Sequence, residues 1–494
     1  MGAVLMALWA GGRGAQAAIR LRRHALPALL AFLGLLWGLW IARAPLPWAI
    51  APVAGAALVV GTFIEPLFGL VVALFLGPLR AWLEIWRPGL VSNAGQAVLV
   101  LALAAWIAGG LWRRELRFPR PPLTVPLLGF LFVALLSLWT PFDVWASFLE
   151  FAKWVQILLV IVMVYDRLTQ PNASRRVALL VAGLAGSAVV QAAIGLWQFG
   201  LRAEGVENFA IDDHLYRAYG TFQQPNPFGA FMGLMGAFLI GLALATIVDR
   251  WQRRRPIPFW VWGVSGAASL AVAGLVASWS RGGWMGFGAA VLMMTVFLPR
   301  RGLWGAVLVA ALLIGGAWLY TTGRLPSAIA SRLTSFLAYT QFDDVRGVGV
   351  TDANYAVIER MAHWQAALSM WRANFWLGVG LGGYGSAYPD YDLINWPLPL
   401  GHAHNYYLNL AAETGLLGLI AFLVWFGALY VRLIVMSRRL TGWQRGLALG
   451  MIGTWTHFAV HSLVDTLLVN NIHLHLAVLL GLAAYVVRTV VRRA

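Results

Sequence analysis

The stretch Gly401–Val435, GHAHNYYLNLAAETGLLGLIAFLVWFGALYVRLIV, joins the two kinds of sequence from which this chain is built. Its first five residues end a long polar interval, and the residues after them form a mostly apolar run. That run is long enough to cross the ~30 Å hydrocarbon core of a membrane as a helix. Ionisable groups such as His402 and His404, placed at the mouth of a membrane helix, are functional candidates.

Composition extends this reading to the whole chain, because 60% of its 494 residues are hydrophobic and only 11% are charged. Soluble globular domains do not have this composition. The apolar runs are continuous rather than alternating, which favours helices over membrane strands. The absence of cysteine excludes disulfides, thiolate nucleophiles and cysteine-ligated metals. We predict an all-α, polytopic integral membrane bundle of about 12–14 transmembrane helices, at residues 25–43, 48–64, 66–82, 94–112, 123–139, 148–165, 177–199, 226–248, 259–279, 284–299, 303–320, 404–435, 446–464 and 473–490.

The basic residues alternate between loops, which predicts the orientation of the chain. If the N-terminus, with Arg13, Arg20, Arg22 and Arg23, is cytoplasmic, most of the 36 Lys and Arg fall in cytoplasmic segments. Only four of the 19 acidic residues fall there: Glu65, Glu115, Asp166 and Asp249. No convincing cleavage site follows the first apolar run, so we expect an uncleaved first helix. The charge of +17 is spread over short loops, which argues against a nucleic-acid-binding patch.

The opposite side receives loop 200–225, the turns at 278–283 and 465–472, and the long loop 321–403. We therefore divide the chain into N-terminal transmembrane helices (1–320), a large external loop (321–403) and C-terminal transmembrane helices (404–494). Within the loop, apolar residues recur at helical spacing and predict an amphipathic helix at 355–376, lying on the membrane or over a cavity. These residues are Val357, Met361, Trp364, Leu368, Trp371 and Phe375.

A first motif, Arg217-Ala-Tyr-Gly-Thr-Phe-Gln-Gln-Pro-Asn-Pro-Phe-Gly229, precedes a predicted membrane helix. Pro225 and Pro227 bar a regular helix there, so we expect broken backbone, which membranes tolerate mainly around a polar cavity. Gln224 and Asn226 would line this cavity. The plainer alternative is a simple helix start with a snorkelling arginine.

A second motif, Ala277-Ser-Trp-Ser-Arg-Gly-Gly-Trp284, places Arg281 between two apolar segments with hardly any loop. A charge at such a position is costly unless it is paired. Gly282 and Gly283 permit close approach of a backbone or a ligand. The plainer alternative is an interfacial turn flanked by an aromatic belt.

Two further patterns suggest other chemistry. Residues Gly378–Gly383 fit G-x-G-x-x-G, but they follow a helix rather than a strand, so we expect a flexible, close-packed segment instead of a dinucleotide site. His457, His461 and Asp465 share one helix face, with His473 and His475 beyond them. This spacing suits either a metal site or, more simply, interhelical hydrogen bonds.

Four features together resemble one family, the O-antigen ligases and related O-antigen polymerases. They are the Arg217–Asn226 segment, the Ser280–Gly283 turn, a large external loop that ends in histidine, and His404-Asn405 followed after nine residues by Gly415-x-x-Gly418. The resemblance covers about 215–420 by motif and the whole chain by hydropathy. It implies about twelve helices, fewer than the fourteen runs counted here.

The resemblance further implies a glycosyltransferase of the bacterial inner membrane whose site faces the periplasm. Such enzymes transfer a glycan from an undecaprenyl-diphosphate carrier to an acceptor, without a metal or another cofactor. Ligases use a lipid A–core sugar, polymerases another carrier-linked glycan, and related enzymes a protein. We expect an O-antigen ligase acting in lipopolysaccharide biosynthesis. The alternatives are an O-antigen or exopolysaccharide polymerase and a protein O-oligosaccharyltransferase.

On this reading Arg217 and Arg281 clamp the diphosphate and His404 is the base that deprotonates the acceptor, since its unperturbed pKa is about 6.5. Attack from the face opposite the diphosphate inverts the anomeric carbon. We expect substrate contacts from His402, Asn405, Gln224, Asn226 and Arg360. Two rival classes remain: a transporter or flippase of lipid-linked sugar, and an intramembrane metalloenzyme built on His457, His461 and Asp465.

Overall fold

A computed structural model describes residues 34–491, except 36, 41–42, 44, 87, 90–92, 140, 203–204, 212–213, 335–343 and 352–353. Within these residues the regular structure is helical, with two isolated β-bridges, Ala210 to Tyr216 and Leu393 to Trp396. The predicted all-α class is confirmed. The chain divides into two compact units, Met1–Ile64 and Glu65–Ala494.

The first unit contains α2 (Leu46–Ile64), which matches the predicted helix 48–64. Of the predicted helix 25–43, residues 34, 35 and 37–40 are described and are helical, and Arg43 lies in a turn. The other residues of that helix and the basic residues Arg13, Arg20, Arg22 and Arg23 lie outside the described residues.

The second unit holds the remaining helices, and the predicted apolar runs coincide with helices to within a few residues at most ends. The bounds are α3 (Pro66–Leu76), α4 (Arg80–Trp86), α5 (Ala94–Trp112), α6 (Thr124–Leu136), α7 (Val144–Leu168), α8 (Ala173–Gly200), η1 (Glu207–Phe209), α9 (Pro225–Gln252), α10 (Phe259–Ala277), α11 (Arg281–Phe297), α12 (Gly302–Thr321), α13 (Ser327–Thr334), α14 (Tyr355–Ala373), α15 (Tyr384–Ala387), η3 (Tyr388–Asp390), α16 (Tyr406–Arg439), α17 (Gly442–His461) and α18 (Ile472–Val491).

Eight of the described helices are long and apolar enough to span a membrane: α5, α7, α8, α9, α10, α12, α16 and α18. The shorter apolar helices 50–64, 66–76 and 124–136 account for further predicted runs. The predicted run 66–82 is divided at Gly77–Leu79, where α3 ends and α4 begins. A polytopic helical membrane protein is therefore confirmed as the class.

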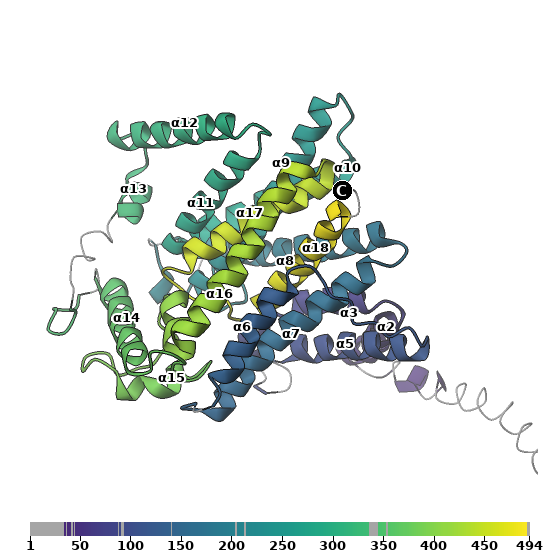
Figure 1. The fold of residues 1–494 in the computed structure, drawn as a ribbon, viewed down its shortest axis with the longest axis horizontal. Coiled ribbons are helices and arrows are strands. Elements are labelled where there is room, and N and C mark those ends of the chain that lie inside the picture. The colour runs from purple at the N-terminus through teal and green to yellow at the C-terminus, as the bar shows by residue number, and fades with distance from the viewer. Residues whose placement is uncertain are drawn as a thin grey trace, which may run out of the picture. The chain divides into compact units, whose positions relative to one another are not determined.

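Helices α9 and α18 form the buried centre of the second unit, since 78% and 83% of their apolar windows are buried, whereas only 6% of that of α12 is. Helix α9 packs against α17, α10, α11 and α8, and Figure 1 shows it running beside α17. A Cβ on Gly241 would lie 2.4 Å from the backbone of Gly450. Paired glycines thus bring the two helix backbones together, as small residues do in membrane bundles.

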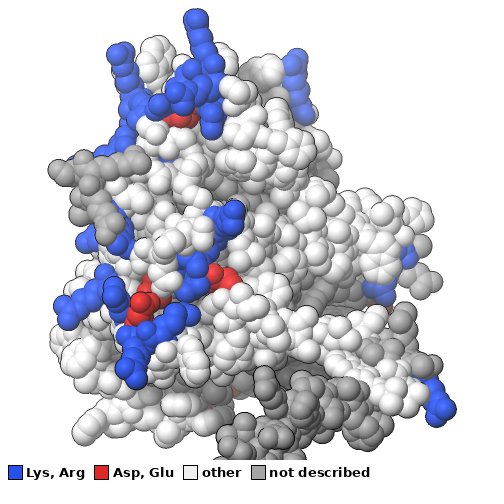
Figure 2. Space-filling model, turned by 90° about the vertical axis from the view of Figure 1, so that its right-hand side faces the viewer, with Lys and Arg blue, Asp and Glu red and all other residues white. Residues whose placement is uncertain are grey.

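Contacts join residues that were predicted to share a side of the membrane. Glu65 pairs with Arg167 and Arg176, and Asp249 pairs with Arg253 and Arg300. All six were expected in cytoplasmic segments or at their edges. Figure 2 shows one face of the molecule, on which Lys and Arg side chains gather in separate groups with uncharged surface between them. The four ion pairs thus join residues of the same predicted side.

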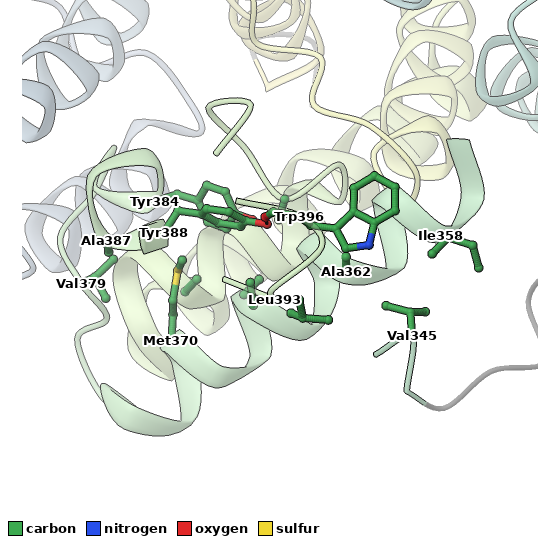
Figure 3. Close-up of a cluster of buried hydrophobic side chains, with 14 residues drawn as sticks. Val345, Ile358, Ala362, Met370, Val379, Tyr384, Ala387, Tyr388, Leu393 and Trp396 are labelled. Atoms are coloured by element: carbon green, nitrogen blue, oxygen red, sulfur yellow. Dashed lines mark hydrogen bonds between the residues drawn. The ribbon is translucent and has the colours of Figure 1, made fainter. Parts of the chain in front are cut away.

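The segment between α12 and α16 forms a small core of its own. Buried side chains of α14, including Ile358, Ala362 and Met370, pack with Tyr384 and Tyr388 (Figure 3). The predicted helix 355–376 is confirmed as α14, but its fully buried face is the alanine-rich one. The stripe that carries Trp364 and Trp371 is only half-buried, because alanines allow the closer approach to α15 and α16.

Helix α16 is broken at Gly415, whose φ of 65° and ψ of −168° lie outside the range of other residues. The backbone groups freed by the break pair with residues 375–380: Leu416 N donates to Phe375 O at 2.8 Å, and Gly380 N donates to Glu413 O at 3.0 Å. A Cβ on Gly415 would lie 2.2 Å from the Trp376 carbonyl carbon. The first glycine of the Gly415-x-x-Gly418 motif is therefore a structural requirement. The segment 378–383 is close-packed, as expected: Gly378 lies against the Glu413 backbone, whereas Gly380 and Gly382 lie against Pro141 and α7.

The expected break at Pro225 and Pro227 is wrong, because α9 begins at Pro225 and continues regularly through Pro227. Proline is tolerated in the first helical turn, where its missing N–H has no intrahelical partner. The irregular backbone lies in the segment just before α9, at Gly220 (φ 54°) and Gln223 (φ 62°).

Candidate functional site

His404 lies at the end of the long connection, immediately before α16, and its backbone is held in the left-handed region at φ 51°. Three contacts fix this turn. His404 N donates to Nδ1 of His402 at 3.2 Å, Ala403 N donates to Oδ1 of Asn409 at 3.0 Å, and Trp364 Nε1 donates to the His404 carbonyl at 3.4 Å. The loop is thereby attached to both α14 and α16, so the ring position is set by rigid elements.

The His404 ring faces Asp465, which lies in the connection between α17 and α18. The distance from His404 Nδ1 to Asp465 Oδ1 is 3.7 Å, close enough for charges to interact but beyond a hydrogen bond. Both ring nitrogens are buried and have no hydrogen-bond partner among the described residues. Burial alone would raise the pKa of the Asp465 carboxyl, but the neighbouring imidazoles and the Arg360 guanidinium hold that pKa well below its usual range. An ionised carboxylate therefore stands beside an imidazole with free nitrogens.

Two further histidines surround this pair. The rings of His402 and His404 are 4.5 Å apart, and the ring of His363 is 5.6 Å from His404. Burial, followed by the neighbouring imidazoles, lowers the pKa of His363 to about 4, and burial and His404 do the same for His402. Both side rings are therefore neutral at physiological pH.

Arg217 precedes α9 in the chain, and its guanidinium group donates hydrogen bonds to two partners. Its Nε donates to the Ser278 carbonyl at 3.1 Å, and its Nη2 donates to Oδ1 of Asn226 at 3.0 Å. The two predicted motifs therefore meet in space, since Ser278 belongs to the turn that precedes α11. Burial, and then the charges of three nearby arginines, lower the pKa of Arg217 to about 9, and the group stays charged at neutral pH.

Arg281 is the first residue of α11, capped by Ser280, whose Oγ accepts from Gly283 N at 3.3 Å. A helix N-terminus directs free N–H groups and a positive dipole end outward, which favours an anion. A Cβ on Gly282 would lie 2.6 Å from the His461 ring. The close approach predicted at Gly282 is thus made by α17.

Arg332, on α13, adds a cation that the sequence reading did not select. Its Nε and Nη2 both donate to the carbonyl of Trp279, at 3.2 and 2.9 Å. Trp279 has a φ of 53°, so Arg332 supports the strained residue just before Arg281. The signal was present, because Arg332 is an arginine in a loop predicted to be external, where the positive-inside rule does not explain it.

The four guanidinium groups of Arg217, Arg281, Arg332 and Arg360, here called the arginine cluster, act on one another electrostatically. Arg360 also donates from Nε to the Val464 carbonyl at 3.3 Å, and its charge acts on Asp465. Arg360 therefore connects the arginine cluster with the pair formed by His404 and Asp465. Among the described residues, no carboxylate lies within ion-pair distance of these four groups, so the cluster has an excess of positive charge.

Two residues predicted to contact substrate have other surroundings. Asn405 is the N-cap of α16, and its Oδ1 accepts from Tyr407 N and Leu408 N at 3.0 and 3.1 Å. Gln224 is exposed at the start of α9. Arg217, Arg281, Arg360, His402 and His404 are the predicted residues that the fold brings together, with Asn226 held by Arg217.

The residues that could hold a metal differ from those predicted. His457 and His461 are adjacent, with Nε2 and Nδ1 3.3 Å apart, but Asp465 has left the helix face. The ligand atoms of His402, His404 and Asp465 instead lie within 4.8 Å of one another. These three residues offer two nitrogens and an oxygen, a donor set that zinc accepts.

Residues 266–423 match the family model described as O-Antigen ligase. The matched region runs from α10 to the first half of α16 and includes Arg281, Arg332, Arg360, His402 and His404. The resemblance predicted from the motifs is confirmed, and this part of the chain carries the domain of the O-antigen ligase family, whose members are membrane glycan-transfer enzymes. The curated proteins contain no match to the chain.

Proposed function

We propose that this protein is an O-antigen ligase that transfers a glycan from an undecaprenyl-diphosphate carrier to a hydroxyl of a lipid A–core sugar. The observation that carries the proposal is the arginine cluster, which has no carboxylate partner among the described residues and lies beside His404 and Asp465. Arginine binds phosphate oxygens through two parallel N–H groups, so four such groups suit a diphosphate. A hydroxyl acceptor needs a base, and the free imidazole of His404 supplies one.

In the proposed reaction the acceptor oxygen forms a bond to the anomeric carbon as the bond from that carbon to the diphosphate oxygen breaks. The electron pair leaves with the diphosphate, whose growing charge the arginine cluster stabilises. The acceptor proton passes to a ring nitrogen of His404, and the Asp465 carboxylate stabilises the resulting imidazolium. Attack opposite the leaving group inverts the anomeric carbon.

The polymerase and protein O-oligosaccharyltransferase alternatives use the same chemistry and differ in the acceptor. One observation favours a second candidate of another class, a metalloenzyme, since His402, His404 and Asp465 gather three ligand atoms. In that reaction a metal would hold the acceptor oxygen or the diphosphate. The proposed reaction instead takes its counter-charge from arginine.

The decisive experiment is glycan transfer in vitro by purified protein, from undecaprenyl-diphosphate-linked O-antigen to lipid A–core. We expect transfer that persists in EDTA. Loss of transfer in EDTA, restored by zinc, would support the metalloenzyme. Movement of the carrier lipid across liposomes without transfer would support a transporter.

The proposal also places the site on the periplasmic side of the inner membrane. Because the protein has no cysteine, single introduced cysteines report the orientation without background labelling. Arg346→Cys, in the connection before α14, should react with an impermeant maleimide in spheroplasts, and Gln252→Cys, at the end of α9, should not. The reverse pattern would contradict a periplasmic site.

A further inference from the structure

A polar pocket elsewhere in the second unit has no part in the chemistry proposed above. It has a volume of about 420 Å³. Its polar lining comes from three separate parts of the second unit: α4 supplies two residues, α7 one, and the connection into α18 together with the first turn of α18 three. These residues are Arg80, Glu84, Lys153, Asn470, Asn471 and His473. A pocket of this size lies within the range typical of small-molecule sites.

The inner part of this pocket carries polar groups without partners. His473 is 2% exposed, and neither of its ring nitrogens has a hydrogen-bond partner among the described residues. The same holds for Nδ2 of Asn471, which is equally buried. Buried polar atoms are nearly always satisfied in folded proteins, so these three atoms are available to a polar ligand of the pocket.

The charges of this pocket differ from those of the arginine cluster. Lys153 forms an ion pair with Glu150, and Arg80 shares the rim with Glu84. The formal charges around the pocket therefore balance, which does not suit a diphosphate. Amide, imidazole, ammonium and carboxylate groups together provide both donors and acceptors. A ligand that offers many hydroxyl groups, each able to donate and accept, matches this lining.

One connection links the pocket to the site. Arg360 contacts Val464, Asp465 faces His404, and Leu468 and Asn470 already line the pocket. Leu468 is three positions after Asp465, which is at most about 11 Å of extended chain. Arg360 of the arginine cluster thus contacts this connection just before Asp465, and the residues that line the pocket follow just after it. In an inverting transfer the acceptor approaches opposite to the diphosphate, so its remaining sugars extend away from the arginines.

We infer that this pocket, lined by Arg80, Glu84, Lys153, Asn470, Asn471 and His473, binds a sugar of the acceptor glycan next to the one that reacts. The inference rests on the proposed function. It assigns these residues to acceptor specificity and leaves donor binding to the arginine cluster.

The test uses full-length protein with two exposed rim variants, Arg80→Ala and Glu84→Gln, which leave the buried part of the pocket intact. Arg372→Ala, which removes an exposed arginine of α14 outside the pocket, is the matched control. Each rim variant should raise the KM for lipid A–core by about tenfold, the effect of losing one hydrogen bond to a charged group. The kcat and the KM for the donor should stay unchanged, as should all constants of the control.

A binding measurement separates failure of this inference from failure of the proposed function. The probes are core oligosaccharide, released by mild acid from the lipopolysaccharide of the bacterium that encodes the protein, and inorganic pyrophosphate. The rim variants should bind the oligosaccharide about tenfold more weakly and pyrophosphate normally. If the wild type transfers no glycan but the rim variants still bind the oligosaccharide more weakly than it does, the pocket stands and the proposed function fails. If transfer occurs but the rim variants match the control in both assays, or lose pyrophosphate binding instead, the inference is overturned.

Discussion

Arginines gather in two regions of this protein, and the two regions differ in whether a carboxylate pairs with them. Just before α3, Glu65 accepts from the buried Arg167 at 2.9 Å and from the half-buried Arg176 at 2.7 Å, so one carboxylate pairs with both cations. In the arginine cluster the corresponding guanidinium groups contact carbonyls and an amide, and their own charges repel. The first arrangement satisfies itself, whereas the second is complete only with an anion.

This difference separates structural from functional arginines within one chain. A buried cation is costly unless a counter-charge is present. The fold provides that counter-charge at Glu65 and Asp249, and it withholds one, among the described residues, at Arg217, Arg281 and Arg332. Holding cations together before the substrate arrives costs stability, but it means that the site needs little reorganisation when a diphosphate binds.

The largest expected effect comes from removing the base beside the unpaired cations. His404→Ala should reduce glycan transfer by about 10²–10⁴-fold, the usual contribution of a general base. Binding of the undecaprenyl-diphosphate-linked donor, measured on the same preparation, should change little because the arginine cluster holds the diphosphate. His402→Ala should be milder. Normal transfer by His404→Ala would remove this residue from the chemistry.

The next effect tests the comparison directly with lysine, which keeps the charge and loses the planar fork. Arg217→Lys and Arg281→Lys should each lower kcat/KM for the donor by about 10- to 100-fold, because a hydrogen bond to a charged group contributes about 1.5–3 kcal/mol. Arg253→Lys, in the ion pair with Asp249, is the matched control and should keep its activity. Full activity of both cluster variants would contradict a diphosphate clamp.

A smaller effect is expected at Arg332, which supports Trp279 as well as adding charge. Arg332→Gln should raise the KM for the donor by about tenfold, since one charge and two hydrogen bonds are altered but three arginines remain. High salt should weaken donor binding less in this variant than in the wild type, because fewer cations contribute. An unchanged donor KM would limit the role of Arg332 to the fold.

The smallest effect on activity is expected from the paired region. Glu65→Gln should leave kcat and both KM values unchanged but lower the free energy of unfolding by about 1–3 kcal/mol, because Arg167 loses its carboxylate in a partly exposed setting. Thermal unfolding in detergent would measure the loss. A variant with reduced transfer and unchanged stability would place Glu65 in the functional region and undo the comparison.

The sequence by itself determined the class of fold and most of the helices. Apolar runs of about 20 residues have few alternatives to membrane helices, since every backbone polar group must be satisfied within the segment. The His404-Asn405-x9-Gly415 motif, together with three other features, predicted the family whose model matches residues 266–423. The sides that the charge alternation assigns to the loops stay a prediction. Even the helix 355–376 was predictable, although its tightly buried face was not, because small residues pack more closely than the aromatic stripe suggests.

Only the tertiary structure decided how the site is assembled. Asp465 was read as a possible partner of His457 and His461 on a helix, yet α17 ends at His461 and the connection turns Asp465 toward His404. Arg332 and Arg217 are more than 100 positions apart in the chain and act on each other through space. The role of Gly415 depends on the backbone of residues 375–380, which lies beside it in the folded chain. Local patterns fix helices because helix bonds are local, whereas a site depends on which helix ends meet, and packing alone settles that.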